Sequence, residues 1–352
     1  MRVFSVVGAR PQFVKLAPVS LALKRAGIIH ESVHTGQHYD YGMSEVFFQE
    51  LRIDQPRWNL GVGSGSHGVQ TGAMLAALDE LFNVERPDWV LTYGDTNSTV
   101  AAALAAVKLH IPVAHLEAGL RSFNRLMPEE HNRVLTDHAS DLLLAPTVIS
   151  ARNLASEGLA DRTTIVGDVM VDILLNTVAD IQSGRVVGLG ERRPQGEYVV
   201  ATIHRAENTE DPARLRSIIN ALREIPIPVL IPVHPRLHVK ASQHGIELAG
   251  GSLQPVQPLS YIELVDAVLG AVAVATDSGG LQKEAYVLGK PTTTIRTETE
   301  WVETLVDGWN VLAPDVRNLA ATVLRTTPVN PVGSPYGDGA ASEAVAFALS
   351  PT

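Results

Sequence analysis

The chain has 352 residues, of which 45% are hydrophobic and 19% are charged, and its formal net charge is −10 at pH 7. This length predicts two domains, and the composition is typical of a globular protein rather than a disordered or fibrous one. The absence of cysteine excludes a disulfide scaffold, thiolate catalysis, iron–sulfur clusters and cysteine-ligated zinc. An acidic chain without a run of Lys and Arg is a poor candidate for binding nucleic acid.

The apolar segments of the chain are short. The stretch that ends at Gly8 is too brief for the hydrophobic part of a signal peptide. The longest uncharged apolar run, residues 267–276, has half the length that a bilayer requires. We therefore expect a soluble, cytoplasmic protein with no membrane partner.

Short apolar runs alternate with amphipathic helical stretches in the first half of the chain. The predicted strands are residues 3–7, 31–34, 89–92, 113–117, 142–145 and 164–166. The predicted helices are residues 13–26, 42–51, 69–83, 98–109, 131–140 and 148–156. This rhythm is typical of βαβ units and a parallel sheet.

The polar stretch 182–196 resembles a connection between domains, and the same rhythm restarts after it. Strands are predicted at residues 198–203, 229–232, 272–276 and 292–295, and helices at 212–225, 261–269 and 280–288. The sequence thus predicts an α/β protein with two doubly wound halves that face each other across a cleft. Because ligands of such sheets bind beyond the carboxyl ends of the strands, the residues that follow each strand are the candidates for function.

The glycine-rich segment Gly63–Gly68 matches the dinucleotide fingerprint GxGxxG, but no apolar strand precedes it. We interpret this segment as a flexible loop and expect no nicotinamide cofactor. His34 and His38 are four residues apart but lack the HExxH pattern, so no metal site is predicted either.

The segment Asp277-Ser278-Gly279-Gly280 follows an apolar strand and opens a helical stretch. Glycines at this point let backbone N–H groups approach an anion, and the helix N-terminus favours negative charge. Glu284 lies one turn further on the same helix face, where it could accept hydrogen bonds from ribose hydroxyls. The alternative is an ordinary helix cap with glycines for close packing.

Arg10 and Lys15 flank the first strand–helix turn and could bind an anionic ligand, although an exposed lysine is the simpler reading of Lys15. Asp95, Glu117 and Glu129 are the candidate acid–base groups, because carboxylates at the ends of neighbouring strands converge on one place. For Asp95 the alternative role is a helix cap. A carboxylate inside the apolar stretch around Glu117 is costly unless it is paired or used.

His204 and Arg205 follow the first strand of the second half, and His234 follows the next strand. A histidine and an arginine that face a phosphate could supply a proton and a fixed positive charge. We therefore expect these residues to bind an anionic substrate.

Several of these segments occur in a fixed order that resembles the non-hydrolysing UDP-N-acetylglucosamine 2-epimerases. They are Gly8-Ala9-Arg10-Pro11, Thr35-Gly36-Gln37-His38, Gly94-Asp95-Thr96, His115–Arg121, Pro128–Arg133, His204-Arg205, Asp277–Gly280 and Pro335–Gly339. The resemblance covers nearly the whole chain and implies the GT-B fold, with two Rossmann-like domains, usually in a homodimer. It implies an N-terminal domain of residues 1–168 with a C-terminal helix at 340–352 packed on it, and a nucleotide-binding domain of residues 169–339.

The resemblance also implies a reaction without a cofactor. UDP leaves C1 of UDP-GlcNAc, a proton leaves C2, and UDP adds back to the 2-acetamidoglucal with protonation of the other face, giving UDP-ManNAc. Asp95, Glu117 and Glu129 would be the acid–base groups, and His204 would assist departure of the diphosphate. Arg10, Lys15, Ser278, Gly279 and Gly280 would hold phosphates, and Glu284 the ribose.

Three segments depart from the common family pattern. Trp301-Val302 replaces Arg-Pro, Ala206 replaces an arginine and Tyr39 replaces another. The Glu-Trp-Val-Glu variant is similar to the branch that epimerises UDP-2,3-diacetamido-2,3-dideoxyglucuronate for surface polysaccharides. The other readings are a GT-B glycosyltransferase and a hydrolysing epimerase.

Overall fold

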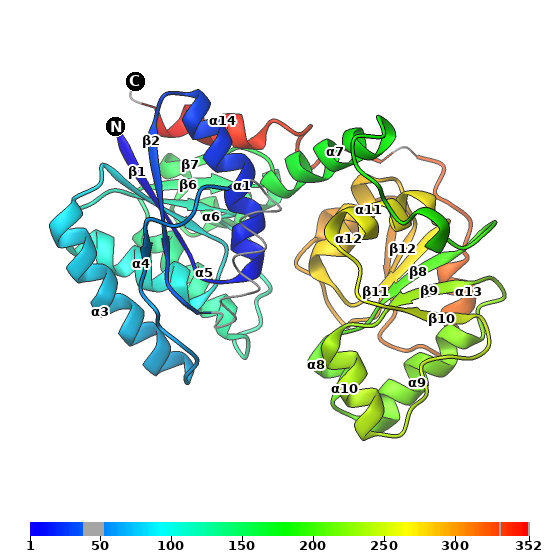
Figure 1. Cartoon of the computed structure of the whole chain (residues 1–352). Helices are drawn as coiled ribbons and strands as arrows, with labels where there is room; N and C mark the ends of the chain where they lie inside the picture. The colour runs from blue at the N-terminus through cyan, green and yellow to red at the C-terminus, as the bar shows by residue number, and fades with distance from the viewer. Residues whose placement is uncertain (38–52, 331, 351–352) are drawn as a thin grey trace. The chain divides into compact units, whose positions relative to one another are not determined.

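A computed structural model describes residues 1–37, 53–330 and 332–350, which form two compact units (Figure 1). Unit 1 comprises residues 1–173 and 335–352, and unit 2 comprises residues 174–334. The helix expected at 42–51 lies outside the described residues.

Unit 1 is built around a seven-stranded sheet in the order β3-β2-β1-β4-β5-β6-β7, in which every paired neighbour is parallel. The strands are β1 (Arg2–Val7), β2 (Ile29–His34), β3 (Trp58–Asn59), β4 (Trp89–Tyr93), β5 (Val113–Leu116), β6 (Leu142–Ala145) and β7 (Thr163–Ile165). The helices are α1 (Arg10–Arg25), α3 (His67–Glu85), α4 (Asn97–Lys108), α5 (Pro128–Ala139), α6 (Val148–Ser156) and α14 (Ala341–Leu349), and α7 (Val169–Gln182) starts in this unit. The strand order reverses between β1 and β4, which is the place where sheets of this kind bind ligands.

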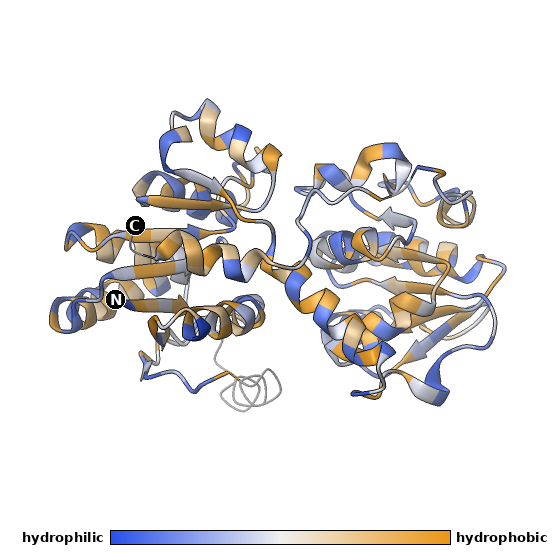
Figure 2. Cartoon of the chain, turned by 90° about the horizontal axis from the view of Figure 1, so that it is seen from above, coloured by the Kyte–Doolittle hydropathy of each residue, from blue (hydrophilic) through white to orange (hydrophobic). Residues whose placement is uncertain are grey.

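Two apolar layers cover the sheet of unit 1. Val3 and Val7 of β1 belong to the cluster that α1 and α14 complete, whereas Phe4 and Val6 belong to the cluster of α3 and α4. This is the arrangement that alternating side chains of a fully buried strand produce. Figure 2 shows the resulting apolar strands between helices with polar outer faces.

The C-terminal segment is tied to unit 1 by one buried carboxylate. Asp172 accepts hydrogen bonds from the backbone N–H groups of Ala341 (3.0 Å) and Ser342 (2.7 Å), and from the Ser342 hydroxyl (2.6 Å). The first N–H groups of a helix have no partner within the helix, so the Asp172 side chain caps the N-terminus of α14.

Unit 2 contains a six-stranded parallel sheet in the order β10-β9-β8-β11-β12-β13. The strands are β8 (Val199–Thr202), β9 (Val229–Pro232), β10 (Leu253–Val256), β11 (Ala273–Thr276), β12 (Thr292–Thr294) and β13 (Asn310–Leu312). The helices are α8 (Ala206–Thr209), α9 (Pro212–Arg223), α10 (Pro235–Gln243), α11 (Tyr261–Gly270), α12 (Gly279–Val287) and α13 (Leu319–Val323). Here the order reverses between β8 and β11.

The structure corrects the sequence prediction in three respects. The strands β3, β10 and β13 were not predicted, and neither were α7, α8, α10 and α13. The stretch 182–196 is not a connection between the units but part of unit 2, because Leu189 is buried in its core and donates its N–H to Asp266 at 2.7 Å. The segment Gly63–Gly68 has the short strand β3 before it, and its last two residues already belong to α3.

Candidate active site

Glu117 directly follows β5, and its carboxylate forms an ion pair with the ammonium group of Lys15 from α1. Only 12% of the Lys15 side chain and 11% of the Glu117 side chain are exposed, so Lys15 is not the surface residue of the simpler reading. Burial by itself would lower the pKa of Lys15, but attraction to Glu117 outweighs it, and the pKa is raised. Lys15 is therefore a buried cation.

The backbone of Glu117 is in the left-handed region, with φ at 74°, a conformation that costs a non-glycine residue roughly 1–3 kcal/mol. The N–H groups of Glu117 and Ala118 both donate to the carbonyl of Leu144 on β6, at 3.1 and 3.2 Å. Strained backbone held in this way is typical of functional sites. The turn therefore fixes the direction in which Glu117 leaves the sheet.

Asp95 follows β4, the neighbour of β5, and its side chain is 32% exposed. Its carboxylate accepts a hydrogen bond from Arg133 at 2.5 Å, and its backbone carbonyl accepts one from Asn132 at 2.9 Å. Both partners lie on α5. Thr96, and not Asp95, caps α4, so the helix-cap alternative for Asp95 is wrong.

The adjacent residues Glu129 and Glu130 in the first turn of α5 differ in environment. Glu130 is buried and accepts hydrogen bonds from the N–H and hydroxyl of Ser122, the N–H of Phe123 and the guanidinium of Arg133. Burial would raise the pKa of Glu130, but these contacts outweigh it and lower the pKa. Glu129 is partly exposed and has no hydrogen-bond or ion-pair partner among the described residues. Of the two, Glu129 is the one available to a substrate.

In unit 2, His204 lies beyond β8 and is oriented by the buried Asp277 at the end of β11. Asp277 accepts hydrogen bonds from the N–H groups of His204 (3.1 Å) and Arg205 (3.0 Å), and its carboxylate lies 3.2 Å from Nδ1 of His204. Burial lowers the pKa of His204, and the positive charges of Arg205 and Arg236 lower it further against the opposing effect of Asp277. A neutral imidazole is therefore favoured in the absence of an anionic ligand.

The start of α12 combines a helix cap with the features of an anion site. Ser278 is the cap, and its hydroxyl accepts a hydrogen bond from the N–H of Leu281 at 3.4 Å. A side chain at Gly279 would place its Cβ 2.7 Å from the Glu300 carboxylate, whereas nothing lies within 4 Å of a Cβ at Gly280. Gly279 is thus required for the approach of Glu300, and Gly280 leaves the helix terminus open.

Three further predicted residues are placed as follows. Glu284 on α12 is buried and accepts a hydrogen bond from the hydroxyl of Tyr261 at 3.1 Å. His234 caps α10, and its ring centroid lies 5.2 Å from that of His204. Arg10 is the first residue of α1, and its side chain lies outside the described part of the structure.

Sequence reasoning did not identify Arg133 or Asp277 as site residues, although both lie in segments that it quoted. For Arg133, the available signal was its place four residues after Glu129, since such residues share a helix face. For Asp277, it was the position at the end of a strand immediately before Ser278. Neither signal revealed the partner residue.

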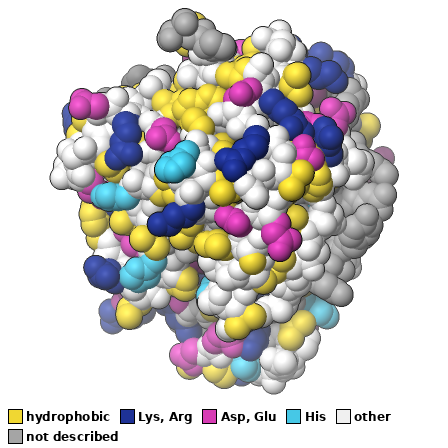
Figure 3. Space-filling view, turned by 90° about the vertical axis from the view of Figure 1, so that its left-hand side faces the viewer, with side chains coloured by type: hydrophobic (Ala, Val, Ile, Leu, Met, Phe, Trp, Pro, Cys, Tyr) yellow, Lys and Arg dark blue, Asp and Glu magenta, His cyan; other side chains and the backbone are white. Residues whose placement is uncertain are grey.

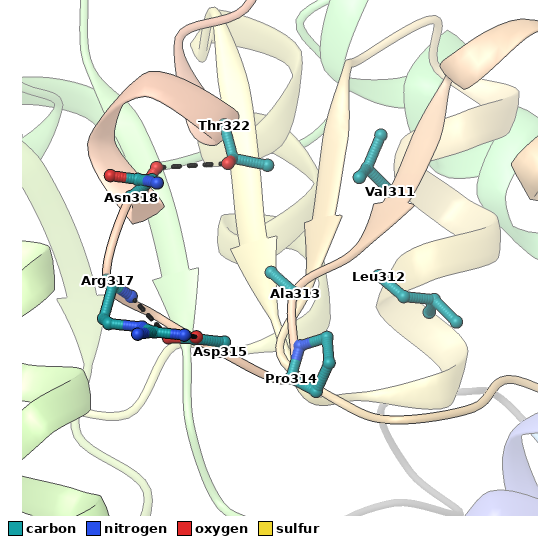
Figure 4. A pocket seen from close by; sticks show the side chains of 8 residues that line it. All are labelled: Val311, Leu312, Ala313, Pro314, Asp315, Arg317, Asn318 and Thr322. Carbon is teal, nitrogen blue, oxygen red and sulfur yellow. Dashed lines mark hydrogen bonds and ion pairs between the residues drawn. The ribbon is translucent and has the colours of Figure 1, made fainter.

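A cavity of about 490 Å³ lies in unit 2 beside β13 and α13 (Figure 4). It is lined by Val311, Leu312, Ala313, Pro314, Asp315, Arg317, Asn318 and Thr322. None of the predicted site residues contributes to it, and its two charged side chains, Asp315 and Arg317, pair with each other.

In the described part of the chain, no helix has the length and hydrophobicity to cross a membrane.

The chain is similar to known proteins over nearly its whole length. Residues 21–350 match the family model described as UDP-N-acetylglucosamine 2-epimerase. The chain is 45% identical to the UDP-2,3-diacetamido-2,3-dideoxy-D-glucuronate 2-epimerase of Pseudomonas aeruginosa, over 98% of both chains. It is 40% identical to a UDP-N-acetylglucosamine 2-epimerase of Methanococcus maripaludis, over 95% of this chain and 94% of the relative.

Among solved structures, the UDP-GlcNAc 2-epimerase of Methanocaldococcus jannaschii in complex with UDP-GlcNAc and UDP matches with a TM-score of 0.84 and 37% identity, over 99% of both chains. The enzyme of Neisseria meningitidis bound to UDP-GlcNAc matches with a TM-score of 0.89 and 28% identity, also over 99% of both chains. The predicted GT-B fold is thereby confirmed. The chain belongs to the UDP-N-acetylglucosamine 2-epimerase family.

Proposed function

We propose that this protein is an epimerase that interconverts UDP-GlcNAc and UDP-ManNAc. The bond between C1 and the diphosphate breaks and UDP takes the electron pair, while a carboxylate removes the proton from C2. The products are 2-acetamidoglucal and UDP. Re-addition of UDP at C1, with protonation of C2 from the opposite face, gives the epimer, and no oxidant or reductant is needed.

The observation that carries this proposal is the arrangement of Asp95 and Glu117 at the ends of the neighbouring strands β4 and β5. Asp95 contacts Arg133 and Glu117 contacts Lys15, so each carboxylate has its own cation. Two carboxylates in different environments can divide the roles of base and acid. The relatives from Methanococcus and Methanocaldococcus, whose names specify this reaction, support the assignment.

Each unit has its own task in the proposal. In unit 1, Asp95, Glu117 and Glu129 move the C2 proton, and Arg10 and Lys15 supply positive charge for the diphosphate. In unit 2, His204 and Arg205 stabilise the departing diphosphate, and His234 contacts the substrate. The backbone N–H groups of Gly279 and Gly280 bind phosphate, because free N–H groups at a helix start suit anions. Ser278, whose own N–H donates to the Thr276 hydroxyl at 2.9 Å, offers its hydroxyl instead. Glu284 binds the ribose.

Proton NMR in D2O tests the reaction. The enzyme should incorporate deuterium at C2 of UDP-GlcNAc and produce UDP-ManNAc. Asp95→Asn and Glu117→Gln should abolish this exchange while leaving the affinity for UDP within about threefold, because neither carboxylate is assigned to the nucleotide. Glu247→Gln, an exposed position between α10 and β10, is the control. Full exchange in both variants would overturn the assignment. Free sugar as the product would indicate a hydrolysing epimerase, and sugar transfer to an acceptor would indicate a glycosyltransferase.

The alternative substrate is UDP-2,3-diacetamido-2,3-dideoxyglucuronate. Two observations favour it, namely the Trp301-Val302 pair and the 45% identity to the Pseudomonas aeruginosa enzyme of that name. Trp301 is 5% exposed, and the ammonium group of Lys283 lies 4.0 Å from the centre of its ring. The tryptophan that replaces the common arginine is therefore packed in the interior of the protein. The D2O experiment with both sugars decides between them by the ratio of kcat/KM.

We also propose a homodimer, as is usual in the family. The helix α3 exposes Val69 (70%) and Val84 (80%), apolar side chains that an interface would cover. Figure 3 shows hydrophobic side chains among charged ones on the face that is at the left in Figure 1. Sedimentation equilibrium of the wild type tests the proposal, and a monomer at all concentrations would contradict it.

A further inference from the structure

His115 on β5 is fully buried, and each of its ring nitrogens has a hydrogen-bond partner. Nδ1 lies 2.7 Å from the carboxylate of Asp137 on α5. Nε2 lies 2.7 Å from the backbone carbonyl of Gly94, the residue before Asp95. The ring of His115 thus connects the end of β4 to α5. In the chain, His115 lies two residues before Glu117.

The protonation of Nδ1 follows from the surroundings of Asp137. This carboxylate also accepts from the guanidinium of Arg121 at 2.7 Å and from the N–H of Gly119 at 3.2 Å. Burial would raise the pKa of Asp137, but His115 and Arg121 outweigh it and lower the pKa. An ionised carboxylate has no proton to give, so Nδ1 of His115 is the donor.

The protonation of Nε2 follows from the chemistry of its partner. A backbone carbonyl only accepts hydrogen bonds, so at 2.7 Å the ring must donate. The two contacts are made together only if both ring nitrogens carry hydrogens, as in an imidazolium. Arg121 also pairs with Glu157 at 2.7 Å. The positive charges of a protonated His115 and of Arg121 are thus balanced by the two carboxylates of Asp137 and Glu157.

The position of this cation relates it to the candidate carboxylates. The Gly94 carbonyl, which contacts Nε2 of His115, belongs to the residue before Asp95. The Asp137 carboxylate, which contacts Nδ1, also accepts a hydrogen bond from the N–H of Gly119, two residues after Glu117. A Cβ at Gly94 would lie 3.1 Å from the carboxylate of Glu117, so movement of the Gly94 carbonyl alters both sites. His115 does not reach the surface and has no direct path to a substrate.

We propose that His115 is a positioning residue, a buried imidazolium that fixes Asp95 and Glu117 relative to each other by holding the Gly94 carbonyl against Asp137. The inference rests on the proposed function, because the groups that His115 positions are the ones assigned to transfer of the C2 proton. Displacements of about 1 Å at such groups reduce rates by about 100-fold.

Nitrogen-15 NMR of the full-length protein labelled on histidine tests the charge. At pH 7.5 both ring nitrogens of His115, assigned by their loss in His115→Gln, should show the shifts of protonated imidazole nitrogens. One unprotonated ring nitrogen in the wild type would overturn the proposal. This measurement needs no turnover, so it is independent of the proposed function.

Two variants test the positioning. Gln places an amide nitrogen near the position of Nε2 and can keep the contact to Gly94, whereas Asn places one near Nδ1 and can keep the contact to Asp137. We expect each to lower kcat for C2 exchange about 100-fold while KM changes less than about threefold. The exposed His238→Gln is the control.

If the wild type exchanges C2 deuterium and both variants keep kcat within threefold, the positioning role is wrong. If the wild type itself shows no exchange with either UDP-sugar, the proposed function is wrong. The charge of His115 is then still tested by the NMR measurement, which does not depend on turnover. Circular dichroism and UDP binding of the variants show that a loss of kcat does not arise from unfolding.

Discussion

The ammonium group of Lys15 and the carboxylate of Glu117, 102 residues apart in the chain, form a nearly buried ion pair. The α-carbon of Gly94 lies against this pair, since a Cβ there would be 3.1 Å from Glu117 Oε2 and 3.5 Å from Lys15 Nζ. A glycine is needed at this point because its φ is 62° and because the two charges occupy the space. The end of β4 is therefore shaped around a salt bridge between α1 and the turn after β5.

Removing the positive charge from this pair should destabilise unit 1 and impair the reaction. Lys15→Met leaves the Glu117 carboxylate buried without its cation, which costs about 3–5 kcal/mol of the free energy of unfolding. Urea unfolding measures the loss, and C2 exchange should fall in parallel. Lys15→Arg, which keeps the charge, should be the milder change, and equal stability of Lys15→Met and wild type would show that the pair contributes nothing.

Arg133 should matter for turnover more than for nucleotide binding. Its guanidinium contacts Asp95 at 2.5 Å and Glu130 at 3.1 Å, and hydrogen bonds to charged groups contribute about 1.5–3 kcal/mol. Arg133→Gln should therefore lower kcat for C2 exchange about 10- to 100-fold and leave UDP affinity unchanged. The exposed Arg125→Gln is the control. Weaker UDP binding with an unchanged kcat would place Arg133 at the nucleotide instead.

Gly119 should tolerate no side chain. Its φ is 81°, and a Cβ would lie 2.3 Å from the backbone carbonyl of Ser150 on α6. Gly119→Ala should lower the free energy of unfolding by about 3 kcal/mol, because neither backbone can shift freely. Gly72→Ala is the matched control, since Gly72 lies within α3 with no atom within 4 Å of a Cβ. That substitution should stabilise the protein by up to about 1 kcal/mol.

Acid should destabilise the protein through His30. Burial lowers its pKa to about 4 from the ordinary 6.5, and its ring nitrogens contact the hydroxyls of Ser20 and Ser5. Between pH 6.5 and 4 the unfolded chain binds a proton that the folded protein does not, so stability falls as the pH falls. The loss reaches about 3 kcal/mol near pH 4 and is absent above pH 7.

Urea unfolding of the wild type and of His30→Gln at pH 7.5 and pH 4.5 measures this effect. The variant carries no titrating ring, so the stability difference between the two pH values should be smaller in it by about 2–3 kcal/mol. An identical pH dependence in both proteins would show that His30 titrates alike in the folded and unfolded states.

The main strands and the residues at their carboxyl ends can be predicted from the amino-acid sequence. The bounds of β6, β9 and α6 agree with the prediction, because buried parallel strands are continuous apolar runs and helices have their own period. Asp95, Glu117 and His204 were predicted as site residues in the same way, since polar residues just after such a run lie at the carboxyl edge of the sheet, where ligands bind. Their roles stay predictions. The edge strands β3, β10 and β13 were missed, because Asn59 in β3, Gln254 and Pro255 in β10, and Asn310 in β13 interrupt the apolar run that marks a strand.

Which groups act together follows from tertiary packing and not from local sequence. Lys15 with Glu117, Arg133 with Asp95, and His115 with Gly94 and Asp137 are contacts between segments 21 to 102 residues apart. Local pattern cannot reveal such pairs, because they arise when separate βαβ units pack on one sheet. The same packing makes 182–196 part of unit 2, since burial of Leu189 is a property of the assembled core and not of its neighbours in sequence.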